Sequence, residues 1–171
     1  MNASPAEAEG PWQQSVAYKV LPPHVKSPNE VDLSQIPTIQ EQPVNSAITA
    51  PAPGHIIDPN EEDTIDVAGY AFSGGGRNIC QVDVSSDGGE TWTVATLSQG
   101  SQQPTLRAWA WTHWAASLPV PSSASTMTVC CRAHDISGEV QPASLLPVWN
   151  LRGLNCNAHH CRTFPIRSAK A

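Results

Sequence analysis

The sequence predicts an all-β protein in which two antiparallel sheets pack into a sandwich. Beyond Pro43, short runs rich in β-branched and apolar residues alternate with Gly, Pro, Asn and Ser, and no segment has the apolar period of a helix. In the clearest runs apolar and polar residues alternate, which is typical of antiparallel strands with one packed and one solvated face. Several short strands of this kind in one domain favour a sandwich of immunoglobulin type.

The predicted strands can be placed in chain order from these runs. Every second residue is apolar in the run 79–85, and the run 127–134 repeats the pattern. The sequence Ser-Asp-Gly-Gly at 86–89 predicts a hairpin turn, because Asp and Gly tolerate positive φ. The predicted strands cover residues 45–49, 64–72, 79–85, 92–97, 107–117, 127–134 and 145–149.

Residues 1–42 predict an extended N-terminal arm, separate from the domain formed by residues 43–171. The arm has little periodicity and many prolines, which remove backbone donors and fix φ. Its apolar residues, among them Trp12 and Leu21, need cover that the arm cannot provide for itself. Two interpretations stay open: the arm lies on the following domain, or it is the end of another domain.

Length and charge narrow the class of protein. A chain of 171 residues has room for one domain and an arm. Only 14% of the residues are charged and six are tryptophan, which argues against intrinsic disorder and predicts that part of the surface is covered. The net charge of −6 provides no basic footprint for nucleic acid. No apolar run reaches the roughly eighteen residues of a membrane span, and the start of the chain does not resemble a signal peptide.

The five cysteines predict mostly free thiols in an intracellular, reducing compartment, since an odd number is not typical of a disulfide scaffold. Cys80, Trp92 and Cys131 follow one another as the disulfide and tryptophan of immunoglobulin domains do. Without a sign of secretion, we expect Cys80 and Cys131 to be two buried thiols. The neighbours Cys130 and Cys131 are expected to be structural and to face opposite ways on a regular strand.

Three groups of residues could carry chemistry, and each has a simpler structural interpretation. The loop 73–77 contains three glycines and an arginine but lacks the Lys and Ser/Thr of a phosphate loop. Trp109, Trp111 and Trp114 could form a stacking platform for carbohydrate, yet such rings more often fill a core or an interface. The segment 155–161 holds Cys and His without the paired spacing of a zinc site, so no metal is expected there.

Arg152 is the candidate anion contact. It follows the apolar run 145–149 and is directly followed by Gly153. A guanidinium held among such neighbours suits bidentate contact with a tetrahedral oxyanion. On residue physics alone, an ordinary surface arginine stays the alternative.

Separated motifs in a consistent order carry a specific resemblance. They are Ala-Ile-Thr at 47–49, Gly-Tyr-Ala-Phe-Ser-Gly-Gly-Gly-Arg at 69–77, Val-Asp-Val-Ser-Ser-Asp-Gly-Gly-Glu-Thr-Trp at 82–92, Ala-Trp-Ala-Trp at 108–111, Cys-Arg-Ala-His-Asp at 131–135, Val-Gln-Pro at 140–142 and Trp-Asn-Leu-Arg-Gly at 149–153. Residues 43–157 thereby resemble the C-terminal dimerisation domain of the molybdenum-cofactor oxidoreductases, the group that contains sulfite oxidase and plant-type nitrate reductase.

The resemblance implies an immunoglobulin-like domain that joins two subunits in a homodimer. Trp-Gln-Gln at 12–14, Tyr-Lys at 18–19 and the sequence at 39–43 resemble the end of the cofactor domain of sulfite oxidases, which implies that residues 1–42 are a remnant of that domain. In the full enzyme, molybdenum on a pterin oxidises sulfite to sulfate. The metal's cysteine ligand lies upstream in the family, which implies that this chain alone binds no molybdenum and is not catalytic by itself.

The resemblance also assigns individual residues. In sulfite oxidases the arginine of Trp-Asn-Leu-Arg-Gly reaches the substrate anion pocket, where nitrate reductases have Met, so Arg152 is implied to contact sulfite. Arg77 matches a loop arginine of the family. The resemblance implies a role for it near the pocket or the interface, less directly than for Arg152. Trp109, Trp111 and Trp149 are expected to lie in the core or at an interface.

The end of the chain departs from the family pattern. His159 stands where the family usually has tryptophan, and Pro165 is expected to interrupt the hydrogen-bond ladder. A regular final strand is therefore not expected.

Two other interpretations remain open. One is a free-standing immunoglobulin-like module that binds a protein or a glycan through its tryptophans, and the other is a coding sequence that begins upstream of Met1. Family members occur in mitochondria and peroxisomes, but the ending at 168–171 is not the peroxisomal Ser-Lys-Leu.

Overall fold

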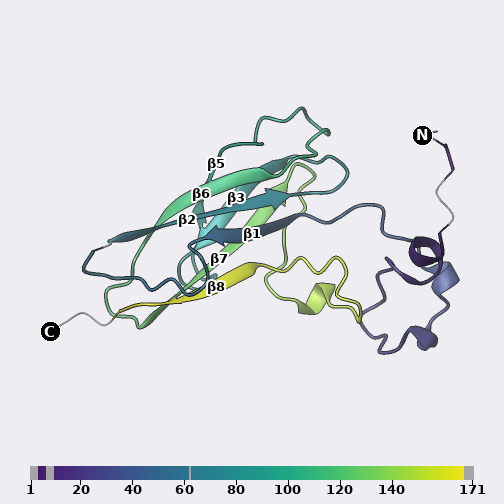
Figure 1. The fold of residues 1–171 in the computed structure, drawn as a ribbon, viewed down its shortest axis with the longest axis horizontal. Coiled ribbons are helices and arrows are strands. Elements are labelled where there is room, and N and C mark those ends of the chain that lie inside the picture. Colours follow the sequence, from purple (N-terminus) through teal and green to yellow (C-terminus); the bar gives the residue numbers. More distant parts are fainter. Residues whose placement is uncertain (1–3, 7–9, 62, 168–171) are drawn as a thin grey trace.

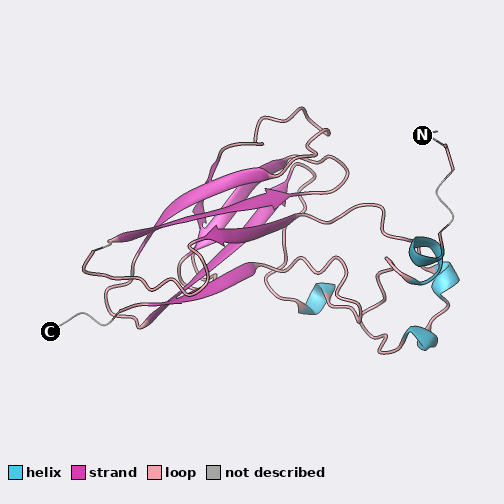
Figure 2. Cartoon of the chain, in the orientation of Figure 1, coloured by secondary structure: helices cyan, strands magenta, loops and turns pink. Residues whose placement is uncertain are grey.

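The computed structural model confirms the all-β sandwich and describes residues 4–6, 10–61 and 63–167. Two four-stranded antiparallel sheets pack face to face, and an N-terminal region with short helical turns lies beyond one end of them (Figures 1 and 2). The expectations about signal peptide and peroxisomal ending concern residues 1–10 and 168–171, which lie partly or wholly outside the described ranges. Along the described ranges, no helix is long and apolar enough to cross a membrane.

The first sheet has the strand order β1-β2-β6-β5. Its strands are β1 (Asn45–Ala50), β2 (Thr64–Phe72), β5 (Thr96–Leu97) and β6 (Thr112–Pro119). Gly69 of β2 lies opposite Trp114 of β6. A Cβ at position 69 would lie 2.0 Å from the carbonyl oxygen of Ala47 and 2.4 Å from the Trp114 ring, so only glycine lets the indole lie against this strand.

The second sheet has the strand order β4-β3-β7-β8. Its strands are β3 (Ile79–Ser85), β4 (Thr93–Val94), β7 (Thr126–Asp135) and β8 (His160–Pro165). The predicted hairpin turn joins β3 to β4, and Asp87 organises it. One Asp87 oxygen accepts hydrogen bonds from Ser85 Oγ at 2.6 Å and from Thr91 N at 2.9 Å.

The core fills the space between the inner faces of the two sheets. From the first sheet it takes Ile48, Ile65, Val67, Ala71, Trp114 and Leu118. From the second it takes Ile79, Val82, Val84, Met127, Val129, Cys131, Ala133 and Phe164. These residues alternate with outward residues along β2, β6 and most of β7, as the sequence pattern predicts.

The single predicted strand at 92–97 is divided between the two sheets. Thr93–Val94 pairs with β3 of the second sheet, whereas Thr96–Leu97 pairs with β6 of the first. Ala95, buried at the crossing, still donates its N–H to the Val82 oxygen at 2.8 Å. A small residue at the crossing lets the chain pass from one layer to the other.

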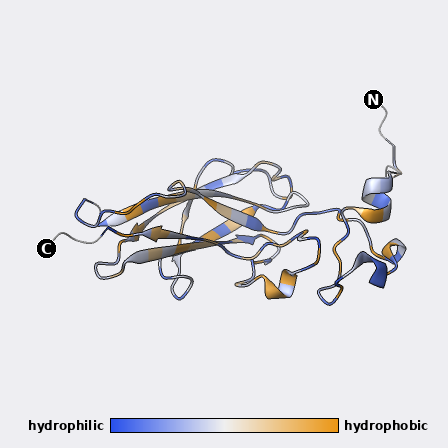
Figure 3. Cartoon of the chain, turned by 60° about the horizontal axis from the view of Figure 1, so that its bottom comes forward, coloured by the Kyte–Doolittle hydropathy of each residue, from blue (hydrophilic) through white to orange (hydrophobic). Residues whose placement is uncertain are grey.

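Two further strand predictions are corrected. The run 107–117 begins its strand only at Thr112, so Trp109 and Trp111 precede β6 and do not share a strand face. The run 145–149 is no strand: Leu146–Val148 form the 3-10 helix η4, the orange turn in Figure 3. Pro147 lacks an N–H for a ladder and suits the first turn of a helix.

The final strand β8 forms, contrary to expectation, and Pro165 ends it without a lost ladder bond. Ile166 N donates to Ser125 O at 2.8 Å, so by the alternation of antiparallel pairs Pro165 stands at a position where the backbone N points away from β7. Its outward carbonyl accepts from Ile57 N at 3.0 Å. An edge position of this kind tolerates proline.

The cysteine prediction is wrong for two of the five residues. Cys130 of β7 and Cys161 of β8 lie directly opposite each other and form a disulfide. Cys80, Cys131 and Cys156 are free thiols. Cys131 is buried as expected, but a bulge between Ile79 and Gln81 leaves Cys80 exposed.

The N-terminal region is irregular but folds upon itself, and Leu21 and Val25 are buried in it. It contains the π-helical turn η1 (Pro11–Val16) and the 3-10 turns η2 (Pro28–Glu30) and η3 (Leu33–Gln35). Lys19 is buried, and its ammonium donates to the backbone oxygens of Leu33 at 2.9 Å and Ile36 at 2.6 Å. The division into residues 1–42 and 43–171 stays a prediction.

Candidate functional site

The loop that carries Arg152 is organised by one buried amide. Asn150 is 3% exposed, and its Oδ1 accepts from the N–H groups of Arg152 at 3.2 Å and Leu154 at 3.3 Å. Its Nδ2 donates to the Leu154 oxygen at 2.7 Å. Gly153 closes the turn with a φ of 66° and donates its N–H to the Asn150 oxygen at 3.0 Å. The Arg152 backbone is therefore held in one conformation.

The Arg152 side chain joins this loop to the N-terminal region. It is half-buried, and its Nη1 donates to the backbone oxygen of Val16. Among the described residues it forms no ion pair with a carboxylate. Its positive charge is thus not neutralised by this part of the chain, and it has further N–H donors for an anion.

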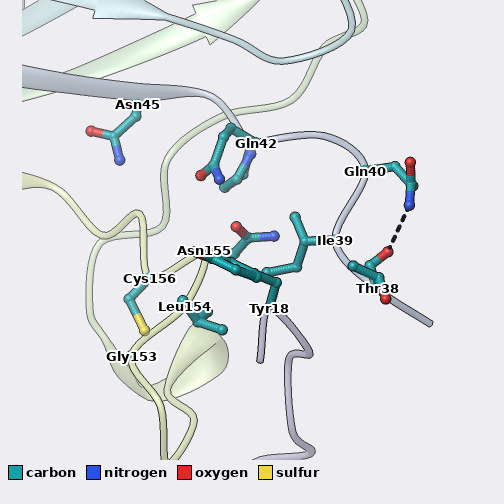
Figure 4. Close-up of a pocket in the computed structure, with 11 residues that line it drawn as sticks. Tyr18, Thr38, Ile39, Gln40, Gln42, Asn45, Gly153, Leu154, Asn155 and Cys156 are labelled. Carbon is teal, nitrogen blue, oxygen red and sulfur yellow. Dashed lines mark hydrogen bonds between the residues drawn. The ribbon is translucent and has the colours of Figure 1, made fainter. Parts of the chain in front are cut away.

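A cavity of about 510 Å³ lies next to Arg152, between the N-terminal region and the loop 153–156. Its walls carry amides and hydroxyls and no charged side chain. Figure 4 shows the side chains of Asn155, Tyr18 and Ile39 gathered around this space. The lining residues are Tyr18, Thr38, Ile39, Gln40, Gln42, Pro43, Asn45, Gly153, Leu154, Asn155 and Cys156.

Asn155 is the least satisfied polar residue of this site. It has a left-handed backbone with a φ of 56°, and its Oδ1 is buried without a hydrogen-bond partner. It also lines a second cavity of about 390 Å³, whose other lining residues are mostly apolar and come from both the N-terminal region and the segment 147–154. The junction between the N-terminal region and the domain therefore holds two cavities, one with polar walls and one that is mostly apolar.

Arg77 occupies a different environment, in which carboxylates surround its guanidinium. Nε donates to Asp135 Oδ2 at 2.9 Å, Nη1 to Glu41 Oε2 at 2.5 Å, and Nη2 lies 3.7 Å from Glu139 Oε2. Hydrogen bonding to Glu41, partly opposed by burial and assisted by Asp135, raises the pKa of Arg77. Gly74 sits beneath the same segment: its N–H donates to the Gln42 oxygen at 2.9 Å, and a Cβ there would overlap the Gln42 backbone. Arg77 ties residues 41–42 to the domain and is not free to bind an anion.

Acid should weaken this tie through Asp135. Burial opposes ionisation of its carboxylate, but hydrogen bonds from Ser137, Ser73 and Arg77 prevail and lower the pKa of Asp135 to about 2. Because the folded pKa lies below the unfolded value of 3.8, the stabilisation is fully present above pH 4 and is lost as the pH falls toward 2. We expect Asp135 to contribute about 2 kcal/mol at neutral pH.

The measurement is urea denaturation of the whole chain between pH 2 and pH 7. Asp135→Asn should lower the unfolding free energy at pH 7 and flatten its fall between pH 4 and pH 2. The exposed Asp63→Asn serves as the control and should do neither. An unchanged acid slope in Asp135→Asn would contradict the assignment.

The tryptophans predicted for core or interface have separate environments. Trp109 and Trp111 are 74% and 54% exposed, so neither belongs to the core, and Trp149 is 38% exposed. Trp114 is 1% exposed and fills the core. It is therefore not part of the three-tryptophan stacking platform that the sequence allowed.

The segment 155–161 does not form a metal site. Cys161 is bonded to Cys130, the Cys156 thiol donates to the Val148 oxygen at 3.2 Å, and His160 Nδ1 accepts from Ile48 N at 3.0 Å. Over the described ranges, no group of three or more His, Cys, Asp or Glu could hold a metal ion. The described side chains therefore offer no group that fits molybdenum, whose cysteine ligand the resemblance places upstream.

Sequence reasoning missed the residues that position the candidate anion contact. Asn150 had a local signal, since an asparagine two residues before an arginine and three before a glycine is typical of a side-chain-closed turn. Glu41 and Val16 had none, because their contacts with Arg77 and Arg152 span 36 and 136 residues. Such contacts depend on how the N-terminal region folds back.

Comparisons with known proteins identify the family. The family model described as "Mo-co oxidoreductase dimerisation domain" matches residues 36–164. Sulfite oxidase of Gallus gallus is 46% identical over 157 residues, 92% of this chain and 33% of that protein. The mitochondrial sulfite oxidase of Homo sapiens is 42% identical over 160 residues, 94% of this chain and 28% of that protein. The match falls on the C-terminal part of such relatives.

A more distant relative and a solved structure extend the comparison. The NADH nitrate reductase of Ulva prolifera is 38% identical over 161 residues, 86% of this chain and 18% of that protein. The sulfane dehydrogenase SoxCD from Paracoccus pantotrophus superposes with a TM-score of 0.61 at 24% identity, over 92% of this chain and 39% of that one. At that identity the likeness shows a shared fold alone.

The chain spans about a third of the length of the sulfite oxidases that it matches. The expected family is thus confirmed over most of the sequence, including all seven motifs from residue 47 to residue 153. This chain belongs to the Mo-co oxidoreductase dimerisation domain family.

Proposed function

We propose that the chain is the C-terminal part of a sulfite-oxidising molybdenum oxidoreductase, in which it joins two subunits and supplies Arg152 to the substrate anion pocket. The assignment of Arg152 to the anion pocket rests on the contrast between Arg152 and Arg77. Arg77 is surrounded by three carboxylates, whereas Arg152 is held on a turn built by Asn150 and has no carboxylate partner among the described residues. Arg152 is the one of the two that can offer its charge to an anion.

The N-terminal region supports the placement of that pocket. Arg152 contacts Val16, and the cavity beside it is lined from both the N-terminal region and the loop 153–156. If residues 1–42 are the end of a preceding cofactor domain, Arg152 faces that domain. A preceding domain would hold the molybdenum cofactor and supply the two-electron oxidation; the contribution of this chain is to bind and orient the anion.

The Arg152 guanidinium suits a tetrahedral or pyramidal oxyanion for two reasons. Its fork of N–H donors can contact two oxygens at once, and its positive charge attracts an anion. The turn around Asn150 holds the backbone in place, so less freedom is lost when the anion binds. The relatives named mitochondrial sulfite oxidase support sulfite as the substrate and mitochondria, in place of peroxisomes, as the location.

A graft into an intact relative tests the role of Arg152. Residues 43–171 replace the matching part of the Gallus gallus sulfite oxidase, and the steady-state kinetics of sulfite oxidation are measured. Arg152→Gln should lower kcat/KM about 30-fold or more, since loss of a desolvated charged contact costs roughly 2–5 kcal/mol. Arg152→Lys, which keeps the charge but loses the fork, should recover part of the loss.

Arg162→Gln is the matched control. This arginine lies on β8, donates to the Pro51 oxygen at 3.2 Å, and should leave kcat/KM within twofold. If the chimera without a further substitution is active and its Arg152→Gln variant has the same kcat/KM, the site assignment is wrong.

A further inference from the structure

A buried glutamine lies a few residues beyond the end of β7. Gln141 is 2% exposed, and its Oε1 accepts from Ser46 Oγ at 2.5 Å and from Ala133 N at 2.9 Å. Its Nε2 donates to the backbone oxygens of Asn157 at 3.0 Å and Ala158 at 3.2 Å. Both acceptor sites and both donor protons of this amide are therefore used.

The chemistry of its neighbours fixes the orientation of the Gln141 amide. A backbone N–H can only donate and a backbone carbonyl can only accept, so the oxygen must face β7 and the nitrogen the two carbonyls. Ser46 gives its hydroxyl proton to Gln141, which leaves its oxygen to accept from the Cys131 thiol, 3.3 Å away. Burial raises the pKa of Cys131 to about 11, so the thiol keeps this proton at neutral pH. A buried amide that makes all of its hydrogen bonds is held in one position.

The chain that leads out of the Arg152 loop, residues 150–156, is fastened to the sandwich at its first residue. Asn157 accepts from Gln141, and it is itself buried. Its Nδ2 donates to the Val44 oxygen at 2.8 Å, directly before the start of β1. The exit of the Arg152 loop is thus tied both to the segment beyond β7 and to the start of β1.

The Arg152 loop itself has no comparable support from packing. Residues 153–156 line the cavity of about 510 Å³, so packing does not hold this side of the loop (Figure 4). Among the described residues, the side-chain hydrogen bonds of Asn150 stay within residues 148–156. Asn150 therefore gives the loop its shape but does not fix its place relative to the two sheets.

We propose that Gln141 is a positioning residue for Arg152: through Asn157, it sets where the loop and its guanidinium lie relative to the sandwich. The proposal rests on the proposed function, because it takes Arg152 to be the contact to the substrate anion. Bidentate contact with an oxyanion depends on the place and the angle of the guanidinium. Loss of Gln141 should therefore weaken binding of the anion and raise KM more than it lowers kcat.

Steady-state kinetics of sulfite oxidation by the Gallus gallus chimera test this role. Gln141→Met nearly keeps the volume of the side chain and removes its amide. It should lower kcat/KM about tenfold, mainly through a higher KM, since a displacement of about 1 Å can cost roughly 100-fold. Ser46→Ala is the matched control, because it removes a bond to the same amide but leaves Nε2 on the two carbonyls. It should leave kcat/KM within twofold.

A double-substitution cycle separates positioning from a general loss of structure. In the Arg152→Gln chimera, Gln141→Met should lower kcat/KM no further, because the contact that it positions is already absent. An equal loss in both backgrounds would mean a purely structural role and would overturn the proposal. An unchanged kcat/KM after Gln141→Met alone would overturn it as well, while the proposed function stands. If Arg152→Gln alone has no effect, the proposed function fails, and this proposal fails with it.

Asn157→Ala keeps the test decisive even if Gln141→Met does not fold. This variant removes the bond to Val44 and leaves the Gln141 amide in place. It should lower kcat/KM in the chimera that retains Arg152 and should have no further effect in Arg152→Gln. Circular dichroism shows whether each variant is folded. A folded Asn157→Ala chimera with unchanged kcat/KM would contradict the proposal.

Discussion

Trp114→Ala is expected to lower the free energy of unfolding by about 3–5 kcal/mol, the range for truncating a large buried aromatic side chain. The indole is 1% exposed and lies against Gly69, where no Cβ intervenes. No other side chain can fill the space, because the strands on both sides of it are held by their ladders. Urea denaturation of the whole chain, followed by circular dichroism, measures the change.

Trp114→Phe separates packing from hydrogen bonding at the same position. The indole Nε1 is buried without a partner, and an unpaired buried donor costs about 1–3 kcal/mol. Phenylalanine keeps most of the ring contacts and removes that donor, so its loss should be about 1 kcal/mol or less. The exposed Trp109→Ala should change stability by no more than about 0.5 kcal/mol. Equal losses for Trp114→Phe and Trp114→Ala would contradict a core role based on packing.

Loss of the Cys130–Cys161 disulfide is the second large expected effect. The bond closes a loop with a sequence separation of 31 residues, and by chain entropy it should stabilise the fold by about 3–4 kcal/mol. It also fastens the edge strand β8, whose neighbour in this sheet is β7. The double variant Cys130→Ala/Cys161→Ala should unfold at a correspondingly lower urea concentration than the oxidised protein.

Two controls make this prediction specific. A dithiol reductant should lower the stability of the unsubstituted protein to that of the double variant and should leave the variant itself unchanged. The exposed thiol variant Cys80→Ser should shift stability by no more than about 0.5 kcal/mol. Titration of the denatured, unreduced protein should find three thiols, and a count of five would overturn the disulfide.

Local patterns predicted most of the sandwich. The alternation in 127–134 reports which side chains face the core, because consecutive side chains of a strand point to opposite faces. The hairpin at 86–89 was predictable because Asp87 and two glycines define the turn by themselves. Pairings over long distances had no such signal, and the run 92–97 reads as one strand although its two halves belong to different sheets.

The sequence predicted which residues belong to the candidate site, but it did not predict which groups surround them. The motif at 149–153 marks Arg152, and the motif at 69–77 marks Arg77. Neither motif shows whether a carboxylate neutralises the guanidinium in the folded protein. The difference comes from Glu41, Asp135 and Glu139, which folding brings to Arg77 from two other parts of the chain. The free or paired state of a charge depends on those partners and therefore on the fold.

By itself, the sequence determined that this protein is an all-β sandwich, because period-two alternation and turn residues act within a few positions. The seven ordered motifs, and not the periodicity, marked it as a member of the molybdenum-cofactor dimerisation family. Only the tertiary structure decided that Trp114 fills the core while Trp111 stays on the surface, and that Cys130 pairs with Cys161. These outcomes depend on register between strands that are distant in the chain, and a strand's own sequence does not encode the register of its neighbour.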